Sequence, residues 1–396
     1  MSTLTLFTIF GPRQVTTLGR VISTFIHQAI DILSLSQSVN KDGISITLTC
    51  QMNIALPQSS SLDVIHSMLR KQGLQCSYQR IDYQDEIPEQ CPILTLLSLG
   101  LNDDHLMKVI STLSSMSIYV KQVNTLSNVS NVVFTNKSTF CIEFKLAGCS
   151  GKYEQLHSAI KALSHELPLD LVLQADASQR KAYKLAVFDM DSTLIKAEVI
   201  DCLAEFAGVS EQVASITKKA MNGELDFNES FKMRMAMLKG VDETVLQGVA
   251  SKLPLMNGAE KLIRNLKMAG FKTVIISGGF MYFAQYLKNK LGIDKIYANE
   301  LEIIDGKVTG QVKGRIIDGA RKAQLMTQLS DQENLQLSQV IAVGDGANDL
   351  PMLKKAGLGI AFNAKPIVQK CAPHVIKEVD LTGILYVLGF LENKVI

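Results

Sequence analysis

Residues 186–194 of the chain read AVFDMDSTL. The apolar run that ends at Phe188 is short and almost purely hydrophobic, which is typical of a strand buried on both faces of a parallel sheet. Two similar runs follow at 273–276 and 340–343, and helical patterns lie between the three. This alternation predicts an α/β fold with a doubly wound, Rossmann-like parallel sheet.

Polar residues follow each of these three runs. Asp189 and Asp191 come directly after the first, Ser277 after the second and Asp345 after the third. In an open parallel sheet, ligands bind beyond the carboxyl ends of the strands, so we expect these side chains to meet at one edge. Lys322 lies in a helical pattern between the second and third runs and can direct its ammonium group to the same point. The sequence therefore predicts a site for an anion and a cation together.

Each of these motifs alone has an ordinary structural explanation. An isolated Asp-x-Asp is usually a solvated turn, a Ser-Gly-Gly run a turn, and a helical lysine a surface charge. Residues 344–346 lack the third glycine of a dinucleotide-binding fingerprint, and residues 151–152 lack the remainder of a phosphate-binding P-loop. It is the convergence of three strand ends that favours a catalytic site.

In this order, the residues resemble the motifs of the haloacid dehalogenase-like phosphatases: Asp-x-Asp-x-Thr, a strand-end Ser or Thr, a Lys, and Gly-Asp-x-x-x-Asp. The resemblance covers residues 184–370, and it is closest to the members that act on phosphoserine. It implies a Rossmann-like core over 184–396 with an inserted helical cap at about 200–258. The closer likeness rests on the run 189–193, Glu198, Phe227 with Arg234, the run 277–280 and the run 344–349.

A magnesium-dependent reaction follows from the demands of a phosphate ester. The carboxylate of Asp189 can attack phosphorus only if a cation neutralises the phosphate, and oxygen ligands from Asp189, the Asp191 carbonyl and Asp345 suit Mg²⁺. Asp191 is then expected to protonate the leaving alcohol and to take a proton from the water that cleaves the aspartyl phosphate.

The other residues of the motifs receive supporting roles. Ser277, Gly278 and Lys322 are expected to hold the phosphoryl oxygens, where fixed donors stabilise the transition state. Asn348 is also expected to bind substrate. Asp349 and Thr193 are expected to support the site from behind, Asp349 by orienting Lys322.

Substrate choice must come from residues outside this phosphate-binding core. Glu198 can pair with an ammonium group and Arg234 can hold a carboxylate by two parallel hydrogen bonds, and together they describe an amino acid. Phe227 is assigned to the same pocket. The expected function is hydrolysis of O-phospho-L-serine, the last step of serine biosynthesis. The alternatives are a phosphotransferase, a phosphatase for another small phosphomonoester, and an ACT-type amino-acid sensor whose phosphatase half has decayed.

The N-terminal half shows a repeated pattern. Residues 1–88 read as strand, helix, two strands, helix and strand, and residues 89–176 repeat this order. Both copies resemble ACT domains, which are ferredoxin-like α+β modules that often bind amino acids. The resemblance implies an amino-acid effector such as serine, and it makes a homodimer a reasonable expectation because such sheets pair edge to edge.

The amino-acid composition limits the classes of partner that the protein can bind. The 40 basic and 38 acidic residues give a formal charge of +2, too small to attract nucleic acid or an anionic membrane. Seven scattered cysteines without a Cys-x-x-Cys pair indicate reduced thiols in the cytoplasm. We expect no export signal, and we interpret the apolar run 383–391 as a buried helix that is too short to span a bilayer.

Overall fold

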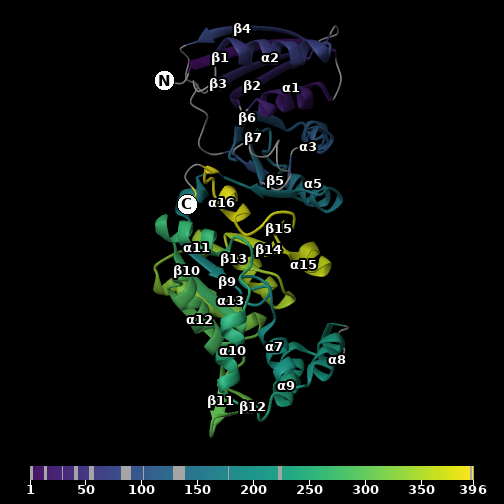
Figure 1. Ribbon diagram of the computed structural model, residues 1–396. Coiled ribbons are helices and arrows are strands. Elements are labelled where there is room, and N and C mark those ends of the chain that lie inside the picture. Colours follow the sequence, from purple (N-terminus) through teal and green to yellow (C-terminus); the bar gives the residue numbers. More distant parts are fainter. Residues whose placement is uncertain are drawn as a thin grey trace. The chain divides into compact units, whose positions relative to one another are not determined.

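The computed structural model describes residues 3–12, 16–28, 30–39, 43–52, 58–81, 91–100, 102–127, 139–176, 178–221, 225–392 and 395 (Figure 1). These residues form two compact units. The first contains residues 1–180 together with 386–395, and the second contains residues 181–385 with Ile396.

The first unit contains two copies of one motif, each with the element order β-α-β-β-α-β. The first copy begins with an alternating strand in which Phe7 and Ile9 are buried, and Phe7 packs against Phe25 of the first helix with ring centroids 4.8 Å apart. Its elements are β1 (Thr3–Gly11), α1 (Thr16–His27), β2 (Asp31–Val39), β3 (Ile44–Met52), α2 (Gln58–Lys71) and β4 (Gln75–Ile81).

The second copy continues the same sheet. Strand β2 pairs with β6 of this copy at Ile32 and Val123, which gives one eight-stranded sheet of order β4-β1-β3-β2-β6-β7-β5-β8. Helices of both copies share a single hydrophobic cluster with this sheet. The elements are β5 (Ile93–Ser98), α3 (Asp103–Ser115), β6 (Tyr119–Thr125), β7 (Phe140–Ala147), α5 (Tyr153–Glu166) and β8 (Asp170–Gln174).

The second unit confirms the predicted α/β fold. Its seven-stranded sheet has the order β12-β11-β10-β9-β13-β14-β15, and all neighbours except β11 and β12 run parallel. All four residues of the central strand β9 are buried, as the apolar run predicts. The strands are β9 (Leu185–Phe188), β10 (Lys272–Phe280), β11 (Lys295–Ile304), β12 (Lys307–Lys313), β13 (Val340–Gly344), β14 (Leu358–Phe362) and β15 (His374–Ile376).

Helices connect these strands. The chain leaves β9 toward β10 on one side and later returns to β13 on the other side, so the topological switch point lies beside β9, where α/β sheets bind ligands. The connecting helices are α11 (Ala259–Met268), α12 (Met281–Leu291), α13 (Gly319–Gln332), α14 (Leu350–Lys355) and α15 (Pro366–Cys371), and the short α6 (Gln179–Ala182) precedes β9.

Four further helices lie in the insertion between β9 and β10, and α9 among them packs against β12 at the edge of the sheet. Helix α9 begins with a capping box, in which the Asp226 side chain accepts from the Glu229 N–H at 2.9 Å and Glu229 reaches back to the Asp226 N–H. The helices are α7 (Val199–Phe206), α8 (Ser210–Met221), α9 (Phe227–Met237) and α10 (Thr244–Lys252).

One predicted element is shorter than the sequence indicates. The run 383–391 forms only the one-turn helix α16 (Gly383–Val387), because Gly389 has a left-handed φ of +83° that ends the helix. Among the described helices, none combines the length and the apolar character needed to cross a membrane. All seven cysteines are free thiols.

Candidate active site

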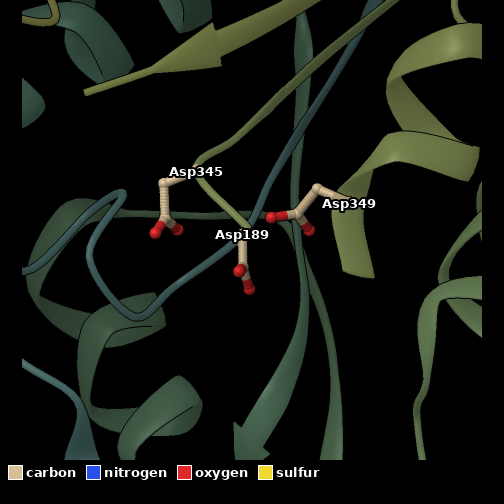
Figure 2. Close-up of side chains that lie close together, drawn as sticks. All are labelled: Asp189, Asp345 and Asp349. Carbon is tan, nitrogen blue, oxygen red and sulfur yellow. The ribbon is translucent and has the colours of Figure 1, made fainter. Parts of the chain in front are cut away.

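Three carboxylates gather at the carboxyl ends of two neighbouring strands (Figure 2). Asp189 follows β9, Asp345 follows β13, and Asp349 lies one short turn further along. Because β9 and β13 are paired in parallel, their ends meet, and one oxygen from each carboxylate lies within 4.8 Å of the others. The predicted meeting of strand ends is therefore present.

A buried lysine holds two of these carboxylates. The Nζ atom of Lys322 lies 2.8 Å from Asp189 Oδ1 and 2.8 Å from Asp349 Oδ1, and its side chain is fully buried. Burial alone would lower the pKa of Lys322, but the two carboxylates outweigh burial and raise it. Asp318 caps the helix that carries this lysine by accepting from the Arg321 N–H at 2.8 Å. Lys322 is thus a fixed positive charge.

The two oxygens of Asp189 have different surroundings. Oδ1 accepts hydrogen bonds from Lys322 and from the Met190 N–H, both at 2.8 Å. Among the described residues, no donor reaches Oδ2. The backbone N–H of Asp189 is tied to the Val343 carbonyl at 2.9 Å. One carboxylate oxygen is therefore held while the other is open to react.

Asp345 and Asp349 differ in how their charge is compensated. Both Asp349 oxygens accept hydrogen bonds, Oδ1 from Lys322 and Oδ2 from the Gly346 N–H at 2.9 Å. Burial, and after it the negative charge of Asp189, raises the pKa of Asp349 to about 6. Among the described residues, Asp345 accepts a hydrogen bond from the Thr193 hydroxyl alone, at 3.2 Å. Burial together with the negative charges of Asp189 and Asp349 raises the pKa of Asp345 to about 8.

The acidic cluster fits a hard divalent cation. Lys322 supplies one positive charge to three carboxylates, so negative charge is left over around Asp345 and the free oxygen of Asp189. Oxygen atoms are the ligands that Mg²⁺ prefers. Asp349 is fully used by Lys322 and Gly346, so Asp189 and Asp345 are the carboxylates best placed to hold the ion.

Asp191 stands at the beginning of the first cap helix. Its Oδ1 accepts from the Val199 N–H of α7 at 3.3 Å. Burial raises its pKa well above 3.8, and the charges of Glu198 and Asp189 act in the same direction. A raised pKa favours the protonated carboxyl group, which is the form that a general acid needs.

The carboxyl end of β10 carries Ser277, Gly278 and Gly279. The Ser277 hydroxyl accepts from the Gly279 N–H at 2.9 Å, so its own hydrogen is free to donate to a ligand. A Cβ at Gly279 would lie 2.6 Å from both Asp191 Oδ2 and the Met190 methyl, so a larger residue there must displace one or both side chains. Asn299 of β11 holds Gly278 by donating to its carbonyl at 2.7 Å.

Two opposite charges lie on the cap side of the site. The Glu198 carboxylate accepts a hydrogen bond from the Ser192 hydroxyl at 2.7 Å. Glu198 lies at the surface, yet limited hydration of its carboxylate raises its pKa. Arg234 is half-buried, and burial lowers its pKa although Asp201 and Glu198 act against this. In the described part of the chain, no carboxylate forms an ion pair with Arg234. Its guanidinium group is available to a ligand.

Two further predicted substrate residues are Phe227 and Asn348. The side chain of Phe227 lies outside what the structure describes, although its backbone begins α9. Asn348 is half-buried, and its Oδ1 lies so close to Gly346 that a Cβ there would be 2.2 Å away. A different aromatic contact joins cap and core, since Phe231 of α9 packs on Phe280 with ring centroids 6.2 Å apart.

Sequence reasoning missed two residues that shape the site. Ser192 has a left-handed φ of +55° and orients Glu198; its place beside Asp191 was a signal, but its backbone conformation was not visible in the sequence. Asn299 links two segments of the site: its amide group donates to the Gly278 carbonyl, and its Oδ1 atom accepts from the Ile317 N–H at 2.9 Å. Ile317 lies just before the helix that carries Lys322. As a single polar residue in a strand, Asn299 gave no signal.

Comparison with known proteins agrees with this geometry. Residues 183–357 match the haloacid dehalogenase-like hydrolase family. The chain is 44% identical over 234 residues to a phosphoserine phosphatase of Archaeoglobus fulgidus, which covers 59% of this chain and 68% of that protein. It is 32% identical over 396 residues to phosphoserine phosphatase SerB2 of Mycobacterium tuberculosis, which covers 98% of this chain and 94% of that protein. A crystal structure of a probable phosphoserine phosphatase from Vibrio cholerae superposes with a TM-score of 0.59 at 32% identity, covering 78% of this chain and 89% of that one.

Proposed function

We propose a reaction course for this chain, which belongs to the phosphoserine phosphatases of the haloacid dehalogenase-like hydrolases. The chain hydrolyses O-phospho-L-serine to L-serine and phosphate, and a phospho-aspartate forms on Asp189 during turnover. The observation that carries this course is the asymmetry of Asp189. One of its oxygens is held by Lys322 and the Met190 N–H, and the other is free to attack phosphorus.

The phosphoryl group is held by fixed donors. In this proposal the Ser277 hydroxyl and the Lys322 ammonium group donate to the phosphoryl oxygens, over which the charge of the transition state is spread. Mg²⁺ bound at Asp189 and Asp345 would neutralise the phosphate dianion so that a carboxylate can approach it. The Thr193 hydroxyl and the Asp349 carboxylate keep Asp345 and Lys322 in place.

Asp191 moves the proton in both half-reactions. The serine alkoxide is a poor leaving group and needs a proton as it departs; Asp191 supplies it, and burial raises the pKa of this carboxyl group in the direction that favours the protonated form. Once ionised, the same carboxylate can take a proton from the water that cleaves the phospho-aspartate. One side chain therefore serves as acid and then as base.

Glu198 and Arg234 select the amino acid part of the ester. In this proposal Glu198, held by the Ser192 hydroxyl, binds the ammonium group. The guanidinium group of Arg234, which has no ion-pair partner among the described residues, binds the carboxylate. Phe227 and Asn348 complete the substrate pocket in this proposal. A truncation of Arg234 would leave the substrate carboxylate unpaired, at a cost of about 2 to 5 kcal/mol in transition-state binding.

The decisive assay is phosphate release from phosphoserine with Mg²⁺ and with no acceptor alcohol. Release favours a hydrolase over a phosphotransferase and over an amino-acid sensor without activity. Arg234→Ala should lower kcat/KM for phosphoserine by roughly thirtyfold to several thousandfold, and p-nitrophenyl phosphate should be affected far less. Arg264→Ala, an exposed arginine of α11, is the matched control. Equal losses for both esters would contradict the specificity role.

The first unit is proposed to be a pair of ACT-type domains that bind an amino acid such as serine. A cavity of about 290 Å³ between the two copies supports a small ligand, and its polar lining includes Ser36, Gln37, Ser114 and Lys121. The loops after β1 and β5, where ACT effectors usually bind, lie partly outside the described residues. Calorimetric titration of the full chain with serine tests this; no heat at millimolar serine would contradict it.

Two further parts of the proposal concern assembly and location. Strands β4 and β8 are the edges of the eight-stranded sheet, and pairing through one of them would give a homodimer, which light scattering can measure. The seven free thiols are typical of a reducing compartment and support a cytoplasmic location.

A further inference from the structure

Ser230 shares a face of the cap helix α9 with the proposed substrate residues. Residues three, four and seven positions apart lie on one side of a helix, so Ser230 falls beside both Phe227 and Arg234. The Nε atom of Arg234 donates to the Ser230 carbonyl at 3.4 Å. The Arg234 side chain therefore runs back along the helix toward Ser230, as long helical side chains do.

The hydroxyl of Ser230 is buried without a partner. The residue is only 1% exposed, and within the described residues Oγ has no hydrogen-bond partner. Buried helical serines normally bond to a carbonyl one turn earlier, as Ser330 does to the Thr327 carbonyl at 2.8 Å. An unsatisfied buried hydroxyl destabilises the free protein, so its presence requires an explanation.

The surroundings indicate what the missing partner is. The negative charges that act most strongly on Arg234 are those of Asp201, Glu198 and Asp191. In the described part of the chain, none of these residues forms an ion pair with Arg234. Among the described residues, the Ser230 hydroxyl has no acceptor and the guanidinium group has only the Ser230 carbonyl, which its Nε atom reaches. A carboxylate, which has two acceptor oxygens, satisfies both at once.

We propose that the Ser230 hydroxyl donates a hydrogen bond to the carboxylate of the bound amino acid ester, beside the guanidinium group of Arg234. This inference rests on the proposed function, because it places the amino acid part of the substrate against α9. It makes Ser230 a specificity residue for phosphate esters that carry a carboxylate. The hydroxyl is unsatisfied in the free enzyme and is satisfied when such a substrate binds.

This arrangement predicts opposite effects on stability and activity for Ser230→Ala. Alanine removes an unsatisfied polar group and has the best helix propensity, so the urea midpoint of unfolding should stay the same or rise. The substrate carboxylate loses a charge-assisted hydrogen bond, so kcat/KM for phosphoserine should fall by about tenfold to a hundredfold. A role in folding alone would move stability and activity in the same direction.

The experiment compares two esters on the full chain with Mg²⁺. O-Phosphoethanolamine has the ammonium group of phosphoserine but lacks its carboxylate, so Ser230→Ala should reduce the preference for phosphoserine over phosphoethanolamine by about tenfold or more. Ser330→Ala is the matched control, because it removes an equally buried helical hydroxyl that is already satisfied. It should lower stability and leave the substrate preference unchanged.

The possible failures are distinguishable. Absence of phosphoserine hydrolysis by the wild-type chain overturns the proposed function and this inference with it. If the wild type is active, an unchanged preference in Ser230→Ala overturns the role of Ser230 alone. An equal loss for phosphoserine and phosphoethanolamine also overturns it, because the hydroxyl would then serve the ammonium group or the phosphate.

Discussion

Replacement of Gly279 by alanine tests the packing between the end of β10 and Asp191, the proposed general acid. An added Cβ would lie 2.6 Å from Asp191 Oδ2 and 2.6 Å from the Met190 methyl, against 3.4 Å for ordinary contact. The methyl group ends a flexible side chain and can move away. Asp191 is anchored by the Val199 N–H, so the clash displaces its carboxyl group by about 0.8 Å.

The displacement sets the size of the effect. A misplacement of about 1 Å in a catalytic group costs on the order of a hundredfold in rate, so kcat for phosphoserine should fall by roughly tenfold to a hundredfold in Gly279→Ala. The loss should be smaller for p-nitrophenyl phosphate, because its leaving group departs without a proton from Asp191. The free energy of unfolding should fall by only about 1 to 3 kcal/mol, as for a modest overpacking.

Steady-state kinetics with both esters, together with urea unfolding, measures these effects. Gly248→Ala is the matched control, because this helical glycine of α10 has nothing within 4 Å of its added Cβ. It should raise the free energy of unfolding by about 1 kcal/mol and leave kcat unchanged. The reasoning is refuted if Gly279→Ala keeps the wild-type kcat, or if both esters lose the same factor.

Three further outcomes are expected. In the metal-free protein, burial and neighbouring carboxylates raise the pKa of Asp345 from 3.8 to about 8. The folded state therefore binds this proton more tightly than the unfolded state, and the melting temperature should fall as the pH rises from about 4 to 8. Bound Mg²⁺ should remove this pH dependence. Asn299→Asp keeps the acceptor for the Ile317 N–H but sets a carboxylate against the Gly278 carbonyl, so kcat should fall by about tenfold or more with both esters, and an unchanged kcat argues against a positioning role. A shortened chain of residues 181–385 should fold and hydrolyse phosphoserine, whereas aggregation or inactivity would show that the second unit needs the first.

The sequence identified the elements whose patterns are local. The apolar runs that end before Asp189, Ser277 and Asp345 lie in the buried strands β9, β10 and β13, because a strand buried on both faces is built mainly from apolar residues. The joining of the two N-terminal copies through β2 and β6 was not predicted, since edge pairing between sheets depends on backbone groups that every residue has.

The position of the site at the strand ends could be predicted from the sequence, but the contacts within the site could not. The predicted supporting role of Asp349 is consistent with its contacts, yet only coordinates reveal that Lys322 holds Asp189 and Asp349 by the same 2.8 Å distance. The constraint at Gly279 arises from contacts with Met190 and Asp191, which are far away in the chain. The Ser230 hydroxyl, buried with no partner among the described residues, is likewise known only from the folded structure. No spacing or composition encodes such contacts.

The central claim is that the phosphoryl group of phosphoserine passes through Asp189. The most direct measurement is an acid quench during turnover with Mg²⁺, followed by proteolysis and mass spectrometry of the peptides. The account predicts one phosphoryl group on Asp189 in the wild-type chain and none in Asp189→Asn, which should also lose at least about 99% of its activity. Turnover that continues in Asp189→Asn, or a phosphoryl group found on Ser192 or Ser277 instead, would contradict the account.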